Sequence, residues 1–403
     1  MEKTLGDMIS NINLDSVDPY LNIEHQEHKQ TISEVPIDIK AKNPSAYQPN
    51  MVSIGPYHFG KPHLMPMQVD KQRSLIHFLK RSSVPIESYL DKLKQVVTLL
   101  RESYEQLDHM KNWQDDNIFI QLMLIDGVFL FEFLSVIRGN QNNYDYATHD
   151  PVFGYEGHML IYDAVMQDLL LMENQLPYLV LSILLSVSEG LPEQSVNGVL
   201  SWMMFAPKKG PGLHLLDMYM KGLLDESQPS KEKEKDEDKS HVRLSASKLH
   251  KYGIQFKRVQ SFNGIKFEKN TATLTLPSIL INQHTVPRFL NLKAYELRTG
   301  TKELNSYIDM LDCLIQSAND VSPLCSQGII INSLGSDEAV VEVVKEITKD
   351  KERRDVDCMS SVVLKEMNDY YGKVAAGKCR RSGNKLASTV LGRRMAYLCY
   401  SLF

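Results

Sequence analysis

Four carboxylates stand among apolar residues in the middle of this sequence. Removing a carboxylate from water is costly unless it is paired, hydrogen-bonded or protonated, so these acids need partners. They could act as an acid–base pair in hydrolysis, as in glycoside hydrolases, or belong to a buried polar network. No sequence spacing places two of them in one cleft, so we favour the network. Its predicted members are Asp126, Glu132, Asp168, Glu173, Asn174 and Gln175.

A second candidate is the heptapeptide Gly55-Pro56-Tyr57-His58-Phe59-Gly60-Lys61, which has the GxxxxGK spacing of a phosphate-binding loop. It follows a possible strand over 51–54. The next residue is Pro62, so the serine or threonine hydroxyl that would bind magnesium is missing. Pro66 is expected to block the helix whose N-terminus would face the phosphates. We therefore predict an ordered turn here and not a nucleotide site.

Other catalytic and metal-binding patterns are weak. His25 and His28 miss the HxxEH metal signature by one residue, and His58 and His63 lack acidic or cysteine ligands at metal spacing. No G-x-S-x-G motif and no CxxC pair occur. The sequence therefore predicts no metal, no cofactor and no catalytic residue. The cysteines, all in the last quarter of the chain, are Cys313, Cys325, Cys358, Cys379 and Cys399.

Charge is distributed unevenly along the 403 residues. The net charge is −5, which is too small to indicate a nucleic-acid partner. The stretch 371–403 contains no acidic residue, so we interpret 374–403 as a basic tail. Such a tail could bind an anionic membrane surface, although simple solvation is the favoured interpretation. The cations are Lys373, Lys378, Arg380, Arg381, Lys385, Arg393 and Arg394.

Targeting signals are not apparent. The first 20 residues lack the apolar stretch of a signal peptide, and no uninterrupted apolar run reaches the roughly 18 residues that span a bilayer. The nearest run, 176–187, is typical of a buried helix. We expect a protein that is not secreted and lies in the cytoplasm or at the periphery of a membrane.

The elements that must position these residues are mostly helical. Residues 1–30 are expected to be a flexible lead, and the six prolines of 31–67 predict an extended arm packed on the surface. An amphipathic helix is predicted over 85–110. Residues 118–137 and 160–187, the latter interrupted at Pro177, are apolar on all sides and therefore belong in the middle of a bundle.

The second half changes character. The charged run 225–239 predicts a disordered loop. Strand patterns follow over 254–259, 265–268 and 272–276, and predict a small antiparallel hairpin or meander. Helices are expected over 285–298, 302–316 and 337–349. The predicted fold class is mainly α: a multi-helix, bundle-like globular body with one small antiparallel β element.

Ordered sequence motifs over 31–373 resemble the plant domain-of-unknown-function 247 family, whose members include UPF0481-like plant proteins. The family-signature turn is identified in Ser53, Gly55, Pro56, Tyr57 and His58. Other matching motifs are Val35-Pro36, Asn43, Ala46-Tyr47, Pro49, Val52, Ile54, Met67 with Lys71, 126–129 with Glu132, 168–177, 247–256, 335–338 and 368–371. The resemblance implies one family-like domain over 31–373, containing the charged loop 225–241.

The resemblance also implies a function class. Members of this family look predominantly helical and have no established enzymatic activity, and some grass members are implicated in self-incompatibility. They usually end in a transmembrane helix after a basic segment, whereas this chain stops at Phe403 after its basic segment. We therefore expect a non-enzymatic recognition or signalling protein with a protein partner, whose specificity lies in loops such as 140–158 and 225–241. The alternatives are a hydrolase that uses the buried carboxylates and a peripheral membrane scaffold.

Overall fold

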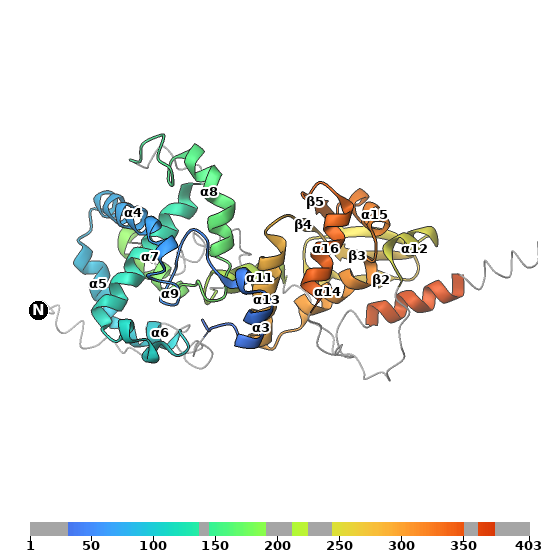
Figure 1. Cartoon of the computed structure of the whole chain (residues 1–403), viewed down its shortest axis with the longest axis horizontal. Helices are drawn as coiled ribbons and strands as arrows, with labels where there is room; N and C mark the ends of the chain where they lie inside the picture. Colours follow the sequence, from blue (N-terminus) through green and yellow to red (C-terminus); the bar gives the residue numbers. More distant parts are fainter. Residues whose placement is uncertain (1–30, 137–144, 191–211, 225–243, 350–361, 375–403) are drawn as a thin grey trace, which may run out of the picture. The chain divides into compact units, whose positions relative to one another are not determined.

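The computed structural model describes residues 31–136, 145–190, 212–224, 244–349 and 362–374 (Figure 1). The protein is mainly α-helical, as predicted. Backbone contacts divide the chain into two compact units, unit 1 (Met1–Gly222) and unit 2 (Leu223–Phe403). The residues predicted as one domain, 31–373, thus include parts of both units.

Unit 1 is a helical body built around one apolar helix, α7. This helix packs against α4, α5 and α9 (Figure 1). The helices of unit 1, the last of which ends at its boundary, are α3 (Ile37–Lys42), α4 (Pro66–Ser82), α5 (Ile86–Gln95), α6 (Val97–Glu102), α7 (Asp116–Val136), α8 (Tyr155–Asp168), α9 (Tyr178–Glu189) and α11 (Leu215–Leu223).

The helix α7 is apolar on all sides because it lies in the core. It is the one helix in the described ranges that is long and apolar enough to cross a membrane, yet 78% of its apolar window is buried within the protein. Gly127 allows α9 to approach closely, because a Cβ at this position would lie 2.7 Å from Leu184 Cδ1 and 2.9 Å from Val180 Cγ1. The predicted position of this helix in the middle of the bundle is therefore confirmed.

Two helix boundaries predicted from the sequence are wrong. The helix expected over 85–110 ends at Gln95 and is followed, after Val96, by the separate helix α6. The helix expected to continue to Pro177 ends at Asp168. Residues 169–177 instead form a buried non-helical segment between α8 and α9. Pro177 disfavours helical backbone at the residue before it, and it precedes the first residue of α9.

As predicted, the proline-rich arm, residues 31–67, does not form a long helix. The expectation that it packs on the surface is wrong. It contains α3 and two short 3₁₀ turns, η2 (Pro44–Tyr47) and η3 (Pro62–Leu64). The part between these turns runs through the interior, where Val52 and Ile54 are fully buried. The strand considered for 51–54 does not form. Near the start of the arm, Ile32 makes an isolated parallel bridge with Tyr104.

Unit 2 combines helices with two small sheets. Its helices α13, α14 and α16 pack against one another, and α15 contacts both α12 and α16. The three helices predicted for this region are confirmed. The helices are α12 (Ala246–Lys251), α13 (Thr285–Thr299), α14 (Glu303–Leu314), α15 (Val321–Ser326), α16 (Asp337–Thr348) and a further helix over 362–374.

The strands of unit 2 do not form the predicted antiparallel meander. β2 (Lys266–Glu268) and β3 (Thr273–Pro277) make an antiparallel hairpin, but β1 (Gln255–Val259) pairs with the other edge of β3 in a parallel direction. A second sheet pairs β4 (Ile279–Ile281) with β5 (Ile330–Asn332), also in parallel. Local strand patterns fix neither the direction of pairing nor a partner 51 residues away, such as Ile330 for Ile279.

Candidate functional site

Asp168, the last residue of α8, binds the backbone of the arm. Its Oδ1 accepts a hydrogen bond from Asn50 N at 2.9 Å, and its Oδ2 accepts from Met51 N at 2.6 Å and Val52 N at 2.9 Å. Burial raises the pKa of this carboxyl group to about 6, although these three N–H donors oppose the shift. Asp168 thus takes the place of a neighbouring strand, which would normally satisfy these N–H groups.

Asn174 and Gln175 lie in the buried segment that follows. Asn174 accepts a hydrogen bond from Ile54 N at 2.6 Å and donates to Val52 O and to Asp168 O. Gln175 donates to two carbonyls of its own segment, Leu169 O and Leu171 O, and accepts from Leu216 N. Carbonyls without helical partners need such donors inside a protein. The two amide side chains therefore stabilise the non-helical backbone of 169–177 and join it to the arm.

Asp126 holds the next part of the arm from the middle of α7. Its Oδ1 lies 2.5 Å from Lys71 Nζ, and its Oδ2 accepts from Gly55 N at 2.8 Å. Lys71 is fully buried and also donates to Ser53 O. Burial raises the pKa of Asp126 and lowers that of Lys71, whereas the contact between them opposes both shifts. The pair joins α4, α7 and the arm.

Gly55 sits where a side chain does not fit. Its φ is +73°, and a Cβ would lie 2.5 Å from Gln175 O and 3.0 Å from the Tyr104 hydroxyl oxygen. That hydroxyl donates to Gln175 O at 3.0 Å. The glycine of the family-signature turn is thus required both by backbone conformation and by close packing. His58, in the same turn, is buried, and its neighbour Tyr57 donates to Glu105 O at 2.7 Å.

Glu173 binds the beginning of the arm. Its Oε1 accepts from Val35 N at 2.9 Å, and Lys40 Nζ lies 2.8 Å from Oε1 and 2.7 Å from Oε2. His58 Nε2 lies 3.4 Å from Oε2. The side chains of Asp126, Asp168, Glu173 and Asn174 are here called the arm-binding cluster. They accept hydrogen bonds from six backbone N–H groups of the arm between residues 35 and 55.

Glu132 belongs to a different place. It lies six residues after Asp126 on α7, which turns its side chain to another face of the helix. It forms an ion pair with Arg81 of α4, and its Oε2 accepts from the Tyr146 hydroxyl at 2.9 Å. Burial raises its pKa, and the guanidinium of Arg81 opposes the shift. Glu132 therefore fixes residue 146 and α4 to α7, away from the arm.

All six predicted network residues are buried, and each of their carboxylate and amide side-chain oxygens accepts at least one hydrogen bond or ion-pair contact from the protein. A general base must instead present an oxygen to a substrate or a water. The observed geometry is suited to stabilising an irregular backbone segment. Within the described ranges, no group of three or more His, Cys, Asp or Glu side chains could hold a metal ion.

The GxxxxGK segment forms a turn. Gly55 and Gly60 both have positive φ, and the segment leads into η3 and not directly into a helix. The expectation that Pro66 blocks the next helix is wrong, because α4 begins at Pro66, where the missing N–H of proline costs no hydrogen bond. Lys61 donates to Gln48 Oε1 and contacts His58 Nδ1, both of which belong to the arm.

Sequence reasoning identified Lys71 only through the family resemblance and missed Lys40 and Tyr104. A signal for Lys71 is present, because it shares one face of α4 with Met67, Ser74 and Phe78, all of which are buried. A lysine on the apolar stripe of a helix needs a buried carboxylate partner.

Several other predictions lie outside the described residues: the lead 1–30 with His25 and His28, the charged loop 225–241, and the tail from residue 375 onward.

Comparison with known proteins gives a family but no activity. A family model described as "Plant protein of unknown function", DUF247, matches residues 32–393. The protein named UPF0481 protein At3g47200, from Arabidopsis thaliana, is 29% identical over 381 residues, covering 85% of this chain and 77% of that protein. Putative UPF0481 protein At3g02645, also from Arabidopsis thaliana, is 22% identical over 458 residues, covering 86% and 84%. No solved structure matches significantly.

The family model spans both units and includes every residue of the arm-binding cluster. This agrees with the resemblance that the ordered motifs of the sequence indicated. The chain belongs to the plant domain-of-unknown-function 247 family.

Proposed function

We propose that this protein acts by binding another protein and not by catalysing a reaction. The observation that carries the proposal is the use of the buried carboxylates: their oxygens accept hydrogen bonds from the arm, from Lys71, Lys40 and Arg81, and from Tyr146. A hydrolase of the glycosidase type needs two carboxyl groups that face a substrate. The acids here stabilise a scaffold, whose outer surface is then available for recognition.

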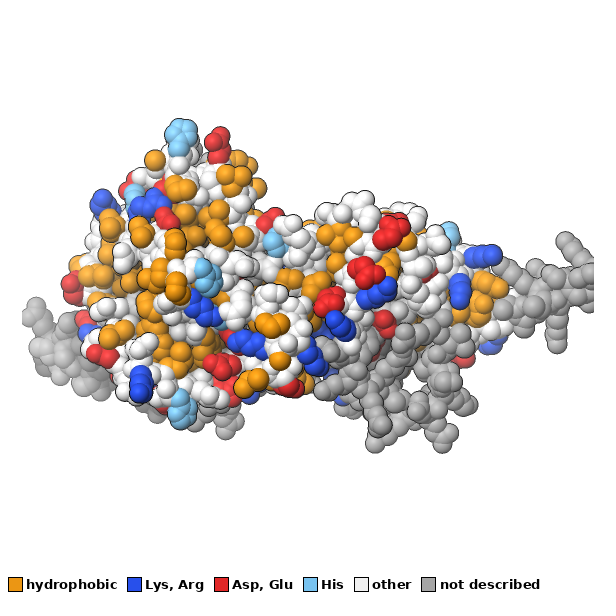
Figure 2. Space-filling view, viewed as in Figure 1, with side chains coloured by type: hydrophobic (Ala, Val, Ile, Leu, Met, Phe, Trp, Pro, Cys, Tyr) orange, Lys and Arg blue, Asp and Glu red, His pale blue; other side chains and the backbone are white. Residues whose placement is uncertain are grey.

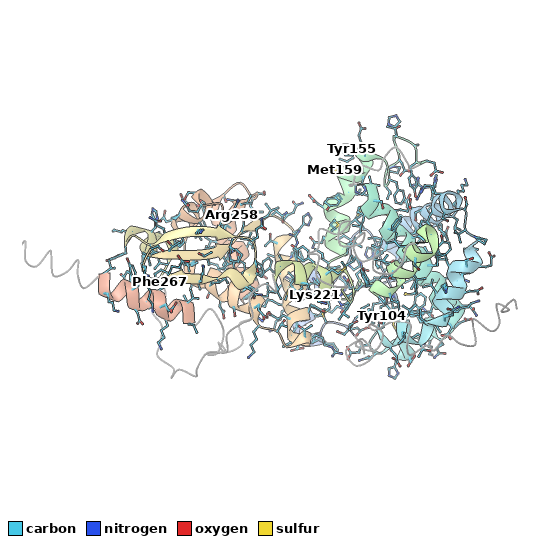
Figure 3. The ribbon with its side chains drawn as sticks, turned by 180° about the vertical axis from the view of Figure 1, so that it is seen from behind. Tyr104, Tyr155, Met159, Lys221, Arg258 and Phe267 are labelled. Atoms are coloured by element: carbon cyan, nitrogen blue, oxygen red, sulfur yellow. The ribbon has the colours of Figure 1, made fainter. Side chains whose placement is uncertain are left out.

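An apolar surface on unit 1 supports this proposal. Tyr155, Met159 and Leu160 of α8 are 57%, 53% and 87% exposed, and Val69 and Ile76 of α4 are also more than half exposed. These five residues are here called the α4–α8 face. Figure 3 places Tyr155 and Met159 along α8, and Figure 2 shows hydrophobic side chains over this part of unit 1. Tyr155 and Met159 are one helical turn apart and therefore share one face of α8. Adjacent exposed apolar residues are typical of sites that bind other proteins.

The segment that leads into α8 is fixed to α4. Arg73, which lies between Val69 and Ile76 on α4, forms an ion pair with Asp150, and its guanidinium lies 5.6 Å from the centre of the Phe153 ring. Asp150 also accepts hydrogen bonds from Val152 N and Phe153 N just before α8 begins. A rigid apolar surface binds with little loss of conformational entropy, which favours a recognition role.

Affinity capture with matched surface variants tests the proposal. The double substitution Tyr155→Ser with Met159→Ser should reduce recovery of bound plant proteins about tenfold or more, because residues that dominate an interface contribute at least about 2 kcal/mol. The control is Leu297→Ser, which alters a 59% exposed leucine of unit 2. Thermal unfolding of all variants should be unchanged. Equal recovery by the double variant and the control would count against the α4–α8 face.

The hydrolase alternative has its own test. If the carboxylates were catalytic, Asp126→Asn or Glu132→Gln would abolish a hydrolytic turnover without lowering the melting temperature. Our proposal expects the reverse, since these substitutions remove structural contacts of buried groups. A variant that keeps its stability and loses a measurable hydrolysis would overturn the proposal.

A further inference from the structure

Lys61 has hydrogen-bond partners unlike those of the other lysines near the arm-binding cluster. Its Nζ donates to the Gln48 amide oxygen at 2.5 Å and contacts His58 Nδ1 at 2.7 Å. Lys40 is paired with Glu173, and Lys71 is paired with Asp126. The two acceptors of Lys61 carry no negative charge, so the ammonium form of Lys61 receives less stabilisation than its two neighbours.

The imidazole of His58 is neutral in this setting. Burial lowers its pKa to about 3, and the charges of Lys61 and Lys40 add to the effect. An ammonium group can only donate a hydrogen bond, so His58 Nδ1 accepts and the ring proton is on Nε2. Nε2 lies 3.4 Å from Glu173 Oε2 and has no hydrogen-bond partner within the residues described. Glu173, His58 and Lys61 therefore form a chain of neighbouring side chains in which the amine is the outer member, with no hydrogen bond between His58 and Glu173.

The outer end of this chain lies at the surface. Lys61 itself is partly exposed, and its neighbours Phe59, Gly60, Pro62 and His63 are exposed. Of the three tetrahedral positions around Nζ that remain beside the bond to the carbon chain, two are directed to Gln48 and His58. The remaining position carries either the third proton or, after deprotonation, the lone pair. Burial and the nearby Lys40 lower the pKa of Lys61, with the more distant charge of Glu173 opposing, and this favours the lone pair.

We propose that the Lys61 amine is a nucleophile that accepts acyl groups from small thioesters, which makes it a modification site on the arm. The structure supplies three features that favour a reactive amine: weak stabilisation of the ammonium form, two neutral hydrogen-bond acceptors that orient the amine, and access from solvent. The inference does not depend on the proposed recognition function. It uses a sequence motif, the GxxxxGK turn, that the proposed function leaves unexplained.

The reaction is a simple acyl transfer. The lone pair of Nζ attacks the thioester carbonyl carbon, so a C–N bond forms and the C–S bond breaks. The sulfur leaves as a thiolate with the bonding electron pair. One proton of the amine passes to the departing thiolate, directly or through solvent water. The products are an amide at Lys61 and a free thiol.

Peptide mass spectrometry of the full-length protein tests the proposal. Acetyl-coenzyme A is the probe, and acetylation of each lysine is measured at low conversion from about pH 6.5 to about pH 9.5, a range over which free amines form. Lys345, a 62% exposed lysine paired with Glu342, is the internal reference. We expect the rate for Lys61 to reach its plateau at a lower pH than that for Lys345. Near pH 7 Lys61 should react about threefold faster or more, since rate follows the free-amine fraction.

A matched variant isolates the cause. Gln48→Glu replaces a neutral acceptor of Lys61 with a carboxylate of the same size, which stabilises the ammonium form. The Lys61 profile should move to higher pH and its rate near pH 7 should fall, while Lys345 is unchanged. If wild-type Lys61 follows the same pH profile as Lys345, the proposal is wrong. It is also wrong if a folded Gln48→Glu protein, verified by its thermal transition, acetylates Lys61 like the wild type.

Discussion

Both units of this protein use buried carboxylates to bind backbone N–H groups, but over very different distances along the chain. In unit 1, Asp168 binds the N–H groups of residues that lie 116 to 118 positions earlier. In unit 2, Glu296 of α13 binds Leu304 N and Asn305 N, which are eight and nine positions later. The first arrangement builds an irregular segment into a helical core, whereas the second joins two successive helices.

The difference shows what each carboxylate replaces. Glu296 provides acceptors for N–H groups at the start of α14, which have no partner within their own helix. The first N–H groups of any helix lack partners within the helix, so an acid nearby in the sequence can accept their hydrogen bonds. The backbone N–H groups of the arm around Val52 and Ile54 have no partners in a helix or strand. Side chains from distant elements, such as Asp168 of α8 and Asp126 of α7, must therefore accept their hydrogen bonds. Unit 1 should therefore lose more stability than unit 2 when one of these acids loses its partners.

The largest effect is expected for Lys71→Met, which leaves Asp126 buried without its cation. Breaking a buried pair in this way costs about 3–5 kcal/mol. Trp113 is buried in unit 1, so its emission during denaturant unfolding reports this unit. The transition should move to markedly lower denaturant concentration.

Lys40→Met is the matched comparison, because the Lys40 side chain is 29% exposed, and its buried partner Glu173 keeps the hydrogen bond from Val35 N. Its cost should be smaller, about 2 kcal/mol, because water can reach the place that Lys40 leaves. The double variant Lys71→Met with Asp126→Asn should recover part of the lost stability, since the uncompensated charge is gone. Equal effects of the two lysine substitutions would remove the distinction between a buried pair and a peripheral one.

A smaller effect is expected when one acid in each unit is replaced by its amide. Asp168→Asn removes a charged acceptor from three N–H groups of the arm and should cost about 2–3 kcal/mol in unit 1. Asp320→Asn alters an acid of unit 2 that binds Ser247 N and Ser317 N. Its cost should be about 1–2 kcal/mol, because hydroxyl groups of both serines remain as nearby partners.

Amide hydrogen exchange measures the local loss of protection in these two variants. In Asp168→Asn, exchange at Asn50, Met51 and Val52 should accelerate more than exchange elsewhere in unit 1. In Asp320→Asn, the change should be confined to Ser247 and the residues around Ser317. Uniform acceleration across unit 1 in the first variant, with no excess at the arm, would contradict the view that Asp168 holds the arm directly.

The parts of this architecture that could be predicted from the sequence are those with local causes. The apolar run of α7 and the stripe of α16, whose Ser336 caps the first turn through Ala339 N, follow from periodicity and capping chemistry. The role of Asp126 and Asp168 in a buried network also follows, because an acid among apolar neighbours must have partners. These inferences need no knowledge of which segments meet in space.

The remaining features depend on contacts between distant segments. The six prolines of the arm predict a surface position, yet Ser53 and Ile54 are buried, because Lys71 of α4 donates to Ser53 O and Asn174 accepts from Ile54 N. The end of α8 at Asp168 is set by side chains that replace helical hydrogen bonds within 169–177, notably Gln175. Propensity describes single segments, and neither the partners of Asp168 nor the parallel pairing of β1 is a property of one segment.

The smallest expected effects concern the pH dependence of stability, to which one group in each unit contributes with opposite sign. In unit 1, burial lowers the pKa of His58 from 6.5 to about 3. The contribution of neutral His58 to the free energy of unfolding is therefore complete above pH 6.5 and is lost as the pH falls toward 3. Glu296 in unit 2 has a pKa raised by burial from 4.5 to about 7, so its contribution is present below pH 4.5 and lost as pH rises through 7. Between pH 6.5 and 4.5, acidification should weaken unit 1 through His58 and strengthen unit 2 through Glu296.

His58→Gln and Glu296→Gln separate the two contributions. Each should flatten the pH dependence of its own unit, by at most about 1.4 kcal/mol per pH unit, the limit for one proton. Tryptophan emission follows unit 1, and the far-ultraviolet circular dichroism of the whole chain adds unit 2. His109→Gln, at an exposed position of unit 1, is the control and should leave the slope unchanged. If His58→Gln and His109→Gln give the same slope, burial of His58 does not make unit 1 sensitive to acid, and the contrast between the units would rest on the carboxylates alone.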